Sequence, residues 1–436
     1  MLNVLVVMID CLRQDRFEGK DKTAITPNLD AFLRRSTAFE NIHAVGSNTT
    51  AVMGSWFTGL YPFHHGLRSF RDRHFIGKPA TMARLMHDSG YHTVTTVTEA
   101  MGDAEDLLDG FEDIERRNKK KEAIHNGYGA RVVDKLDELN ESQQPWFYFV
   151  HTCELHPDRQ CDPRFQSRRY GRNFYDRCLS SVDHYLGPIF EAVDWEDTVV
   201  VVFGDHGDNL LWEPSGEFAS RVMNRLRADG RMSLLWRLRD AFYRAGLYSR
   251  WKGILRNNAL FHHDYHVYRF LTHSPLMIAG PGLAAGRRID SPMSSVDMMP
   301  TLFDFLGLPK PMGIDGYDFA PLLRGESMDV PSRALYQEVV TDFVLKGRDP
   351  SKLRIPLLHA LIEDGWKYVE SMLDRKIQPE LYNLLEDPLE RHNRYLKWRD
   401  TALVKNFAAK LRTIEDEHAV AAATDISPND SLLASA

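Results

Sequence analysis

Four short runs of apolar residues stand out along the chain. They are rich in valine and aromatic residues, and polar or turn-forming residues bound each of them. Runs of this length and composition are typical of strands covered on both faces of a sheet. The four runs span residues 2–9, 146–150, 198–203 and 275–279.

Stretches with helical spacing lie between these runs. Residues 28–35, 82–88 and 175–193 are the clearest, and the third places Leu179 and Val182 on one apolar face. Strands that alternate with helices form βαβ units, which favour a mostly parallel sheet. The pattern therefore predicts an α/β fold with helices covering a central parallel sheet.

The pattern changes near residue 353. Two short strand-like pieces, 357–362 and 367–370, precede a predicted helix over 400–417. A chain of 436 residues is too long for one small core. We therefore expect one large α/β domain over residues 1–350, a small C-terminal α+β subdomain over 351–418, and a loose tail over 419–436.

Composition narrows the classes of protein. Hydrophobic residues make up 43% and charged residues 26%, as in soluble globular proteins, and the net charge of −7 argues against nucleic-acid binding. No apolar run is long enough for a membrane span, and the apolar start lacks the basic region of a signal peptide, so we expect a cytoplasmic protein. Reduced thiols are expected at the four cysteines, Cys11, Cys153, Cys161 and Cys178.

Polar side chains with acid/base or metal-binding chemistry follow three of the predicted strands. Asp10 follows the first, the segment from His151 to His156 follows the second, and Asp205 with His206 follows the third. In open α/β sheets, ligands bind outside the carboxyl ends of the strands. Aspartate oxygens with one imidazole suit Ca, Mn, Mg or Zn. Taken singly, an aspartate at such a position is more often a helix cap than a metal ligand.

Several ordered sequence blocks resemble one known family. NVLVVMIDCLRQD, TPNLDAF and NTTAVMGSWFTGLYPFHHG are followed by PWFYFVHTCELHP, VVVVFGDHGD, HSPLMIAGPG and ELYNLLEDPLERHN. This order is similar to the sulfatase family of the alkaline phosphatase superfamily. The resemblance covers nearly the whole chain except an insert near residues 210–260. It implies a three-layer α/β fold and hydrolysis of sulfate or phosphate esters.

The resemblance also implies roles for individual residues. Asp10, Asp205 and His206 match ligands of one divalent cation, and Thr49 lies nine residues before Thr58, at the position of the family's nucleophile. The resemblance also implies that Thr49 is itself a ligand of the cation. His156 matches a histidine that contacts the transferred group or protonates the leaving group.

Two more positions have alternative interpretations. His263 lies where relatives often carry a site histidine or lysine, and a surface histidine is the alternative. Thr50 competes with Thr49 as the reactive hydroxyl.

Three departures from the family pattern bear on the chemistry. The C/S-x-P-S-R signature for formylglycine is absent, because the chain reads TTAVM from Thr49 onwards. Cys11 replaces the second acidic ligand, and Thr98 stands at about the place of a lysine. A threonine hydroxyl beside a cation can still attack phosphorus, as in related phosphodiesterases and headgroup transferases. We therefore expect phosphoester or phosphodiester chemistry rather than sulfate chemistry.

The insert has a distinct charge. Residues 217–257 contain ten Lys/Arg against three acidic residues, with aromatic residues interleaved. It is interpreted as a helical cap over the mouth of the site. The alternative is a docking surface for an anionic substrate or for peripheral membrane contact.

Three functions remain open on the sequence alone. The first is a metal-dependent hydrolase of phosphate or sulfate esters, with a small-molecule, glycan or lipid ester as substrate. The second is a transferase that passes a phosphoryl headgroup from a lipid or polysaccharide precursor. The third is a binding protein that retains the fold without turnover.

Overall fold

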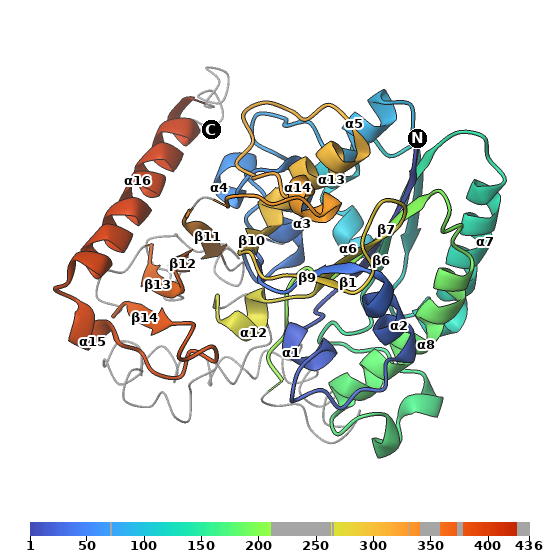
Figure 1. Cartoon of the computed structure of the whole chain (residues 1–436), viewed down its shortest axis with the longest axis horizontal. Helices are drawn as coiled ribbons and strands as arrows, with labels where there is room; N and C mark the ends of the chain where they lie inside the picture. The colour runs from blue at the N-terminus through green and yellow to red at the C-terminus, as the bar shows by residue number, and fades with distance from the viewer. Residues whose placement is uncertain are drawn as a thin grey trace, which may run out of the picture.

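The computed structural model describes most of the chain (Figure 1). The described residues are 1–69, 72–210, 263, 266–330, 332–340, 358–372 and 378–424, with side chains to residue 416. The predicted basic insert falls almost entirely outside these residues, as does the end of the predicted tail from residue 425. Among the described residues, no helix is long and apolar enough to cross a membrane.

An eight-stranded sheet forms the centre of the molecule. Its strands, in spatial order, are β5 (Asp113–Arg117), β4 (His92–Thr98), β6 (Trp146–Thr152), β1 (Asn3–Ile9), β7 (Thr198–Phe203), β8 (Leu276–Ala279), β2 (Thr37–Phe39) and β9 (Arg287–Ile289). All neighbouring pairs are parallel except those that β8 makes with β7 and β2. The four apolar runs thus form β1, β6, β7 and β8.

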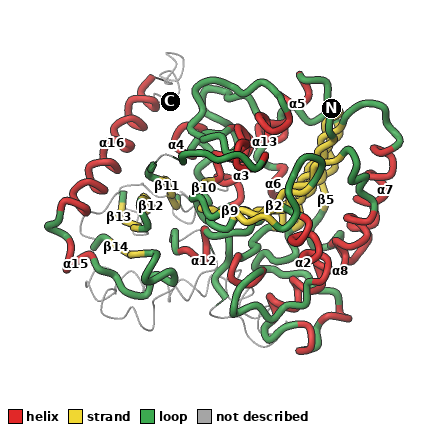
Figure 2. The backbone as a smooth tube through the Cα atoms, viewed as in Figure 1, coloured by secondary structure: helices red, strands yellow, loops and turns green. Residues whose placement is uncertain are grey.

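Helices cover both faces of this sheet, which gives three layers (Figure 2). Even-numbered side chains of β1, from Val4 to Met8, belong to one apolar core, and odd-numbered ones, from Leu5 to Ile9, belong to the other. The first face is covered by α3 (Thr49–Thr58), α5 (Met82–Asp88), α13 (Met298–Leu306) and α14 (Ala320–Arg324). The second is covered by α2 (Pro27–Arg35), α7 (Gly129–Asn140) and α8 (Phe174–Glu191).

A second, antiparallel sheet lies at the C-terminal end. It is formed by β11 (Leu335–Val339), β12 (Leu358–Glu363), β13 (Trp366–Ser371) and β14 (Glu380–Asn383). The long helix α16 (Ala402–Thr424) packs on it through Phe407 and Leu411, with a contribution from α4 (Pro62–His65). The helix continues beyond the expected end at residue 417. The predicted α/β class, with a small C-terminal antiparallel sheet, is confirmed.

Shorter elements connect these layers. They are α1 (Gln14–Phe17), α6 (Glu99–Gly102), α12 (Arg269–Thr272), α15 (Tyr395–Trp398) and a two-stranded sheet of β3 (Ile42–His43) with β10 (Met293–Ser294). No two of the four cysteines are joined in a disulfide.

Candidate active site

The carboxyl ends of β1 and β7 bring two aspartates together. Asp10 follows β1 directly, and Asp205 lies two residues beyond β7. The strands are parallel neighbours, so both side chains emerge at the same edge of the sheet. Asp205 Oδ1 accepts the backbone N–H of Cys11 at 3.0 Å and of His206 at 2.7 Å. These two hydrogen bonds fix the orientation of the Asp205 carboxylate.

His206 presents one ring nitrogen to this carboxylate. Its Nδ1 donates to the Gly207 carbonyl at 2.8 Å, which leaves Nε2 unprotonated in a neutral ring. Nε2 lies 3.3 Å from Asp205 Oδ2 and 3.3 Å from Thr49 Oγ1. A nitrogen lone pair that faces a carboxylate oxygen requires a proton or a cation between them. A backbone partner on the opposite nitrogen is the usual arrangement for a metal-binding histidine.

Two buried carboxylate oxygens complete a donor set for a cation. Asp10 Oδ1 and Asp205 Oδ2 have no hydrogen-bond partner among the described residues. Asp10, Asp205 and His206 place three potential ligand atoms within 4.8 Å of one another, all buried. Uncompensated carboxylates are costly to bury, so the residues fit a divalent cation.

The two carboxylates have opposite pKa shifts. Burial acts to raise the pKa of Asp10, but the His151 hydrogen bond and the nearby His156 and His206 outweigh it and hold the pKa well below its usual range. Burial raises the pKa of Asp205. Asp10 therefore keeps its negative charge readily, and a bound cation would stabilise the negative charge of Asp205 as well.

Thr49 is the first residue of α3, and its hydroxyl faces His206. The Asn48 side chain caps the helix by accepting the Ala51 N–H at 2.8 Å. Thr49 is half-buried, whereas its neighbour Thr50 is 7% exposed, and among the described residues no side-chain hydrogen bond joins Thr50 to the site. The partial positive charge at a helix N-terminus favours an anionic group beside Thr49.

His151 is a site residue that the sequence placed at a strand end, in the segment from His151 to His156, without predicting an individual role for it. It lies within β6 instead of following it, because this strand extends to Thr152. Its Nε2 is 3.4 Å from Asp10 Oδ2, and its Nδ1 is 3.4 Å from the Thr98 hydroxyl. Its position opposite Met8 in the register of β1 and β6 is the signal that places it beside Asp10.

His156 is held by two charged neighbours. Its Nδ1 donates to Asp158 at 2.7 Å, and Lys119 Nζ lies 3.2 Å from the same nitrogen and donates to Asp158 at 2.9 Å. Burial lowers the pKa of His156, since it outweighs the opposing effect of Asp158, and Lys119 lowers it further. Lys119 and Asp158 were not selected from the sequence, and only the loop after β5 brings the lysine here.

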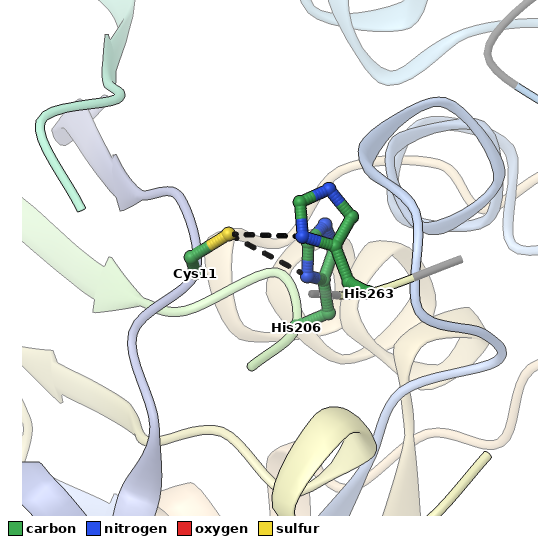
Figure 3. A group of neighbouring side chains, drawn as sticks. All are labelled: Cys11, His206 and His263. Atoms are coloured by element: carbon green, nitrogen blue, oxygen red, sulfur yellow. Dashed lines mark hydrogen bonds between the residues drawn. The ribbon is translucent and has the colours of Figure 1, made fainter. Parts of the chain in front are cut away.

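His263 lies between His156 and the cation donors. Its ring centroid is 5.2 Å from that of His156 and 4.7 Å from that of His206. Cys11 Sγ lies 3.8 Å from His263 Nδ1 and 3.9 Å from His206 Nδ1, and its sulfur is directed at both rings (Figure 3). The structure thus brings together Asp10, Thr49, Asp205 and His206. The ring of His263 lies next to His206, and that of His156 lies next to His263.

A buried ion pair of Arg159 with Asp208 supports His263. Arg159 donates to Asp208 Oδ2 at 2.6 Å, and Arg13 donates to the Asp208 carbonyl at 2.8 Å. The other carboxylate oxygen of Asp208 lies 3.4 Å from His263 Nδ1. Asp208 is therefore neutralised by Arg159 and orients His263.

Comparisons with known proteins agree with this architecture. A family model described as "Sulfatase" matches residues 2–308, and one described as "N-sulphoglucosamine sulphohydrolase, C-terminal" matches residues 260–417. The chain is 22% identical to arylsulfatase K of Bos taurus, over 84% of this chain and 70% of that protein. It is 23% identical to arylsulfatase K of Gallus gallus, over 94% and 82% respectively.

Solved structures share the fold. The phosphonate monoester hydrolase of Agrobacterium radiobacter superposes with a TM-score of 0.71 at 17% identity and 96% coverage of both chains. A structure described in complex with its substrate D-glucosamine-2-N,6-O-disulfate superposes with a TM-score of 0.65 at 14% identity, over 96% of this chain and 98% of that one.

Proposed function

Because the chain belongs to the sulfatase family and is an ester hydrolase, we propose that it hydrolyses phosphoesters through Thr49 with the help of one divalent cation. One observation carries this proposal. The Thr49 hydroxyl lies at the N-terminus of α3, 3.3 Å from His206 Nε2, beside two buried carboxylates that have unpartnered oxygens. Nucleophile and cation donors therefore share one site.

Asp10, Asp205 and His206 would hold the cation. When bound, it supplies positive charge that lowers the pKa of a neighbouring hydroxyl and offsets charge on the transferred group. The N-terminus of α3 adds its partial positive charge at the same place. His151 fixes Asp10 and the backbone of Cys11 fixes Asp205, so both carboxylates are oriented in advance.

The remaining residues perform the transfer. Thr49 Oγ forms a bond to phosphorus as the bond to the leaving oxygen breaks, and the hydroxyl proton passes to solvent water. The protonated His156 ring donates its Nε2 proton to the departing alkoxide, while Nδ1 remains bound to Asp158 beside Lys119. A water oxygen then bonds to phosphorus as the bond to Thr49 Oγ breaks; one proton of the water returns to Oγ and His156 accepts the other. His263, which lies between His156 and His206, positions the transferred group.

The choice of phosphorus over sulfur follows from Thr49. Threonine cannot be converted to the formylglycine that the family's sulfate chemistry implies. The similarity to a phosphonate monoester hydrolase supports this choice, and the similarity to a complex with a sulfated glucosamine supports an anionic sugar or small-molecule ester as the substrate class.

An ester panel tests the proposal. Metal-free protein should be inactive, and added divalent cation should restore turnover of nitrophenyl phosphate or bis-nitrophenyl phosphate over nitrophenyl sulfate. Thr49→Ala should lower kcat at least about 10³-fold, as expected for loss of a nucleophile, while the matched Thr50→Ala should retain most activity. A preference for the sulfate ester, or full activity without a cation, would overturn it.

A further inference from the structure

The donor set contains a thiol that the proposed function leaves unused. Cys11 is fully buried, and its Sγ lies 3.8 Å from His263 Nδ1 and 3.9 Å from His206 Nδ1 (Figure 3). Cys11, His206 and His263 form one group of potential metal ligands, and Asp10, Asp205 and His206 form another. The two groups share His206: the thiol lies 3.9 Å from its Nδ1, and Asp205 Oδ2 lies 3.3 Å from its Nε2.

The spacing of sulfur and nitrogen fits ligands of one cation. Zinc bonds are about 2.3 Å to sulfur and about 2.0 Å to nitrogen, which puts the two atoms about 3.5 Å apart in a tetrahedral site. The observed 3.8 Å between Cys11 Sγ and His263 Nδ1 is close to this value. The same contact also fits a hydrogen bond between the thiol and the ring nitrogen, as drawn in Figure 3, so titration with a metal ion is needed to separate the two.

The backbone holds Cys11 in an unusual conformation. Its φ is +63°, a left-handed value that side chains rarely adopt and that has a cost in free energy. Two hydrogen bonds maintain it: the Cys11 N–H donates to Asp205 Oδ1 at 3.0 Å, and its carbonyl accepts the Tyr175 hydroxyl at 2.7 Å. One of the two hydrogen bonds that orient Asp205 thus also fixes the position of the thiol.

We propose that Cys11 is a thiolate ligand of the candidate metal centre, and that it makes the centre select a thiophilic cation of the Zn²⁺ class over Ca²⁺ or Mg²⁺. The inference rests on the proposed function, since it concerns the same cation. Thiolate and imidazole ligands favour Zn²⁺, whereas an all-carboxylate set favours hard cations. On binding, the thiol proton is released to solvent and a sulfur–metal bond forms.

The most direct test uses Co²⁺ in place of zinc on the full-length wild-type protein. A thiolate bound to Co²⁺ gives a sulfur-to-metal charge-transfer band in the near ultraviolet, and wild-type protein should show it at one equivalent of Co²⁺. The isosteric Cys11→Ser variant should lose this band, and the matched control Cys161→Ser should keep it. Absence of the band from wild-type protein would overturn the inference, whether or not the variants fold.

Affinities provide a second readout that does not depend on turnover. Loss of an outer partner of a metal ligand costs about 10- to 100-fold in affinity, so loss of a direct ligand in Cys11→Ser should weaken Zn²⁺ binding by more than about 100-fold. Cys11→Asp should shift the preference toward Ca²⁺ and Mg²⁺. Unchanged Zn²⁺ affinity in Cys11→Ser would contradict a direct bond.

The outcomes separate this inference from the proposed function. A charge-transfer band in a protein that turns over no phosphoester would leave the thiolate ligand standing and refute the proposed function. Cation-dependent phosphoesterase activity that requires Thr49, without the band, would retain the proposed function and refute the thiolate ligand.

Discussion

The site combines side chains whose protonation is fixed by their neighbours. The Nδ1 of His206 is committed to the Gly207 carbonyl and that of His156 to Asp158, so both rings have a defined tautomer before any ligand binds. Asp205 is likewise oriented by two backbone N–H groups. Preorganised groups of this kind need no rearrangement when charge develops on a reacting ester.

A substitution at His151 tests this orientation. His151 contacts Asp10 but is not among the proposed ligands, so its removal should act only through that carboxylate. His151→Ala should weaken binding of the divalent cation by about 10- to 100-fold, the usual effect of losing an outer partner. Calorimetric titration of the metal-free protein measures the change.

His151→Gln, whose side-chain amide can still donate toward Asp10, should recover part of the affinity. The control His184→Ala, at an exposed position on α8, should bind the cation like wild type. Equal affinity of His151→Ala and wild-type protein would show that Asp10 needs no such support.

Among the elements, α3 positions the proposed nucleophile Thr49. Where α3 packs against α4, there is no room for a side chain at Gly54. A Cβ on Gly54 would lie 2.4 Å from the ring of His65. That ring is fully buried and held by contacts with the Ser55 hydroxyl at 3.1 Å and the Leu67 N–H at 3.1 Å. The position of α3 relative to α4 therefore depends on the absence of a side chain at Gly54.

Gly54→Ala should destabilise the protein although alanine is the better helix former. The gain in helix propensity is at most about 1 kcal/mol, whereas overpacking against a held ring costs about 1–3 kcal/mol. Denaturant unfolding should show a net loss. In Gly54→Ala/His65→Ala the two effects should be less than additive, since the clash is gone; strict additivity would rule out the proposed contact.

A second contact between elements, from α8 to the N-terminus of α2, predicts that the stability of the fold depends on pH. Asp183 on α8 accepts the N–H of Leu29 at 2.7 Å and of Asn28 at 3.2 Å, and so caps the N-terminus of α2. Burial raises the pKa of Asp183 to about 6 in spite of these hydrogen bonds. A carboxyl whose folded pKa is raised stabilises the fold most below its unfolded pKa, and this contribution is lost as pH rises through about 6.

Asp183→Asn removes this titration. The free energy of unfolding of the variant relative to wild type should therefore rise by about 2–3 kcal/mol between about pH 4 and about pH 7. Urea unfolding of both proteins across this range measures it. A difference that stays constant with pH would show that Asp183 does not titrate in the folded protein.

Across the whole molecule, the C-terminal sheet supports the segment that leads to Thr49. On β11, Glu338 donates its N–H to the Val45 carbonyl at 2.7 Å, and Gln337 donates to the Ala44 carbonyl at 2.8 Å. The Glu338 carboxylate also accepts two hydrogen bonds of 2.7 Å from Arg68. The second sheet thus holds a loop of the main domain that ends at the nucleophile.

Removal of the Arg68–Glu338 pair should loosen this connection. Glu338 is buried and Arg68 only partly exposed, so Arg68→Met should lower the free energy of unfolding by about 2–4 kcal/mol. The matched control is Arg73→Met, which breaks the exposed pair with Asp103 and should cost less than about 1 kcal/mol. Similar losses in both variants would argue against a structural role for the pair.

The sequence predicted the parts of the molecule that local patterns determine. Valine-rich runs such as β7, in register beside β1, identified the centre of the sheet, and the polar residues after them identified Asp10 and Asp205. β4 was not among the four runs because threonines interrupt it; Thr93 and Thr95 are buried there through hydrogen bonds to the Gly110 and Phe149 carbonyls.

Contacts between distant segments could not be read from local patterns. Cys11 and His263 are 252 positions apart, and no spacing rule predicts that their side chains meet. Lys119 reaches His156 from the loop after β5, which lies beside β4 at the edge of the sheet. The sequence placed His151 after the strand and predicted no role for it, because the length of β6 decides whether this residue precedes or follows the strand end.

The central claim is that Thr49 accepts the phosphoryl group, and trapping that intermediate tests it most directly. Cation-loaded enzyme would be quenched in acid during turnover of a nitrophenyl phosphodiester, digested and mapped by mass spectrometry, with Thr49→Ala as the control. The account predicts one added phosphoryl group on Thr49 and none in Thr49→Ala. A phosphoryl group on Thr50, or turnover by Thr49→Ala at the wild-type rate, would contradict it.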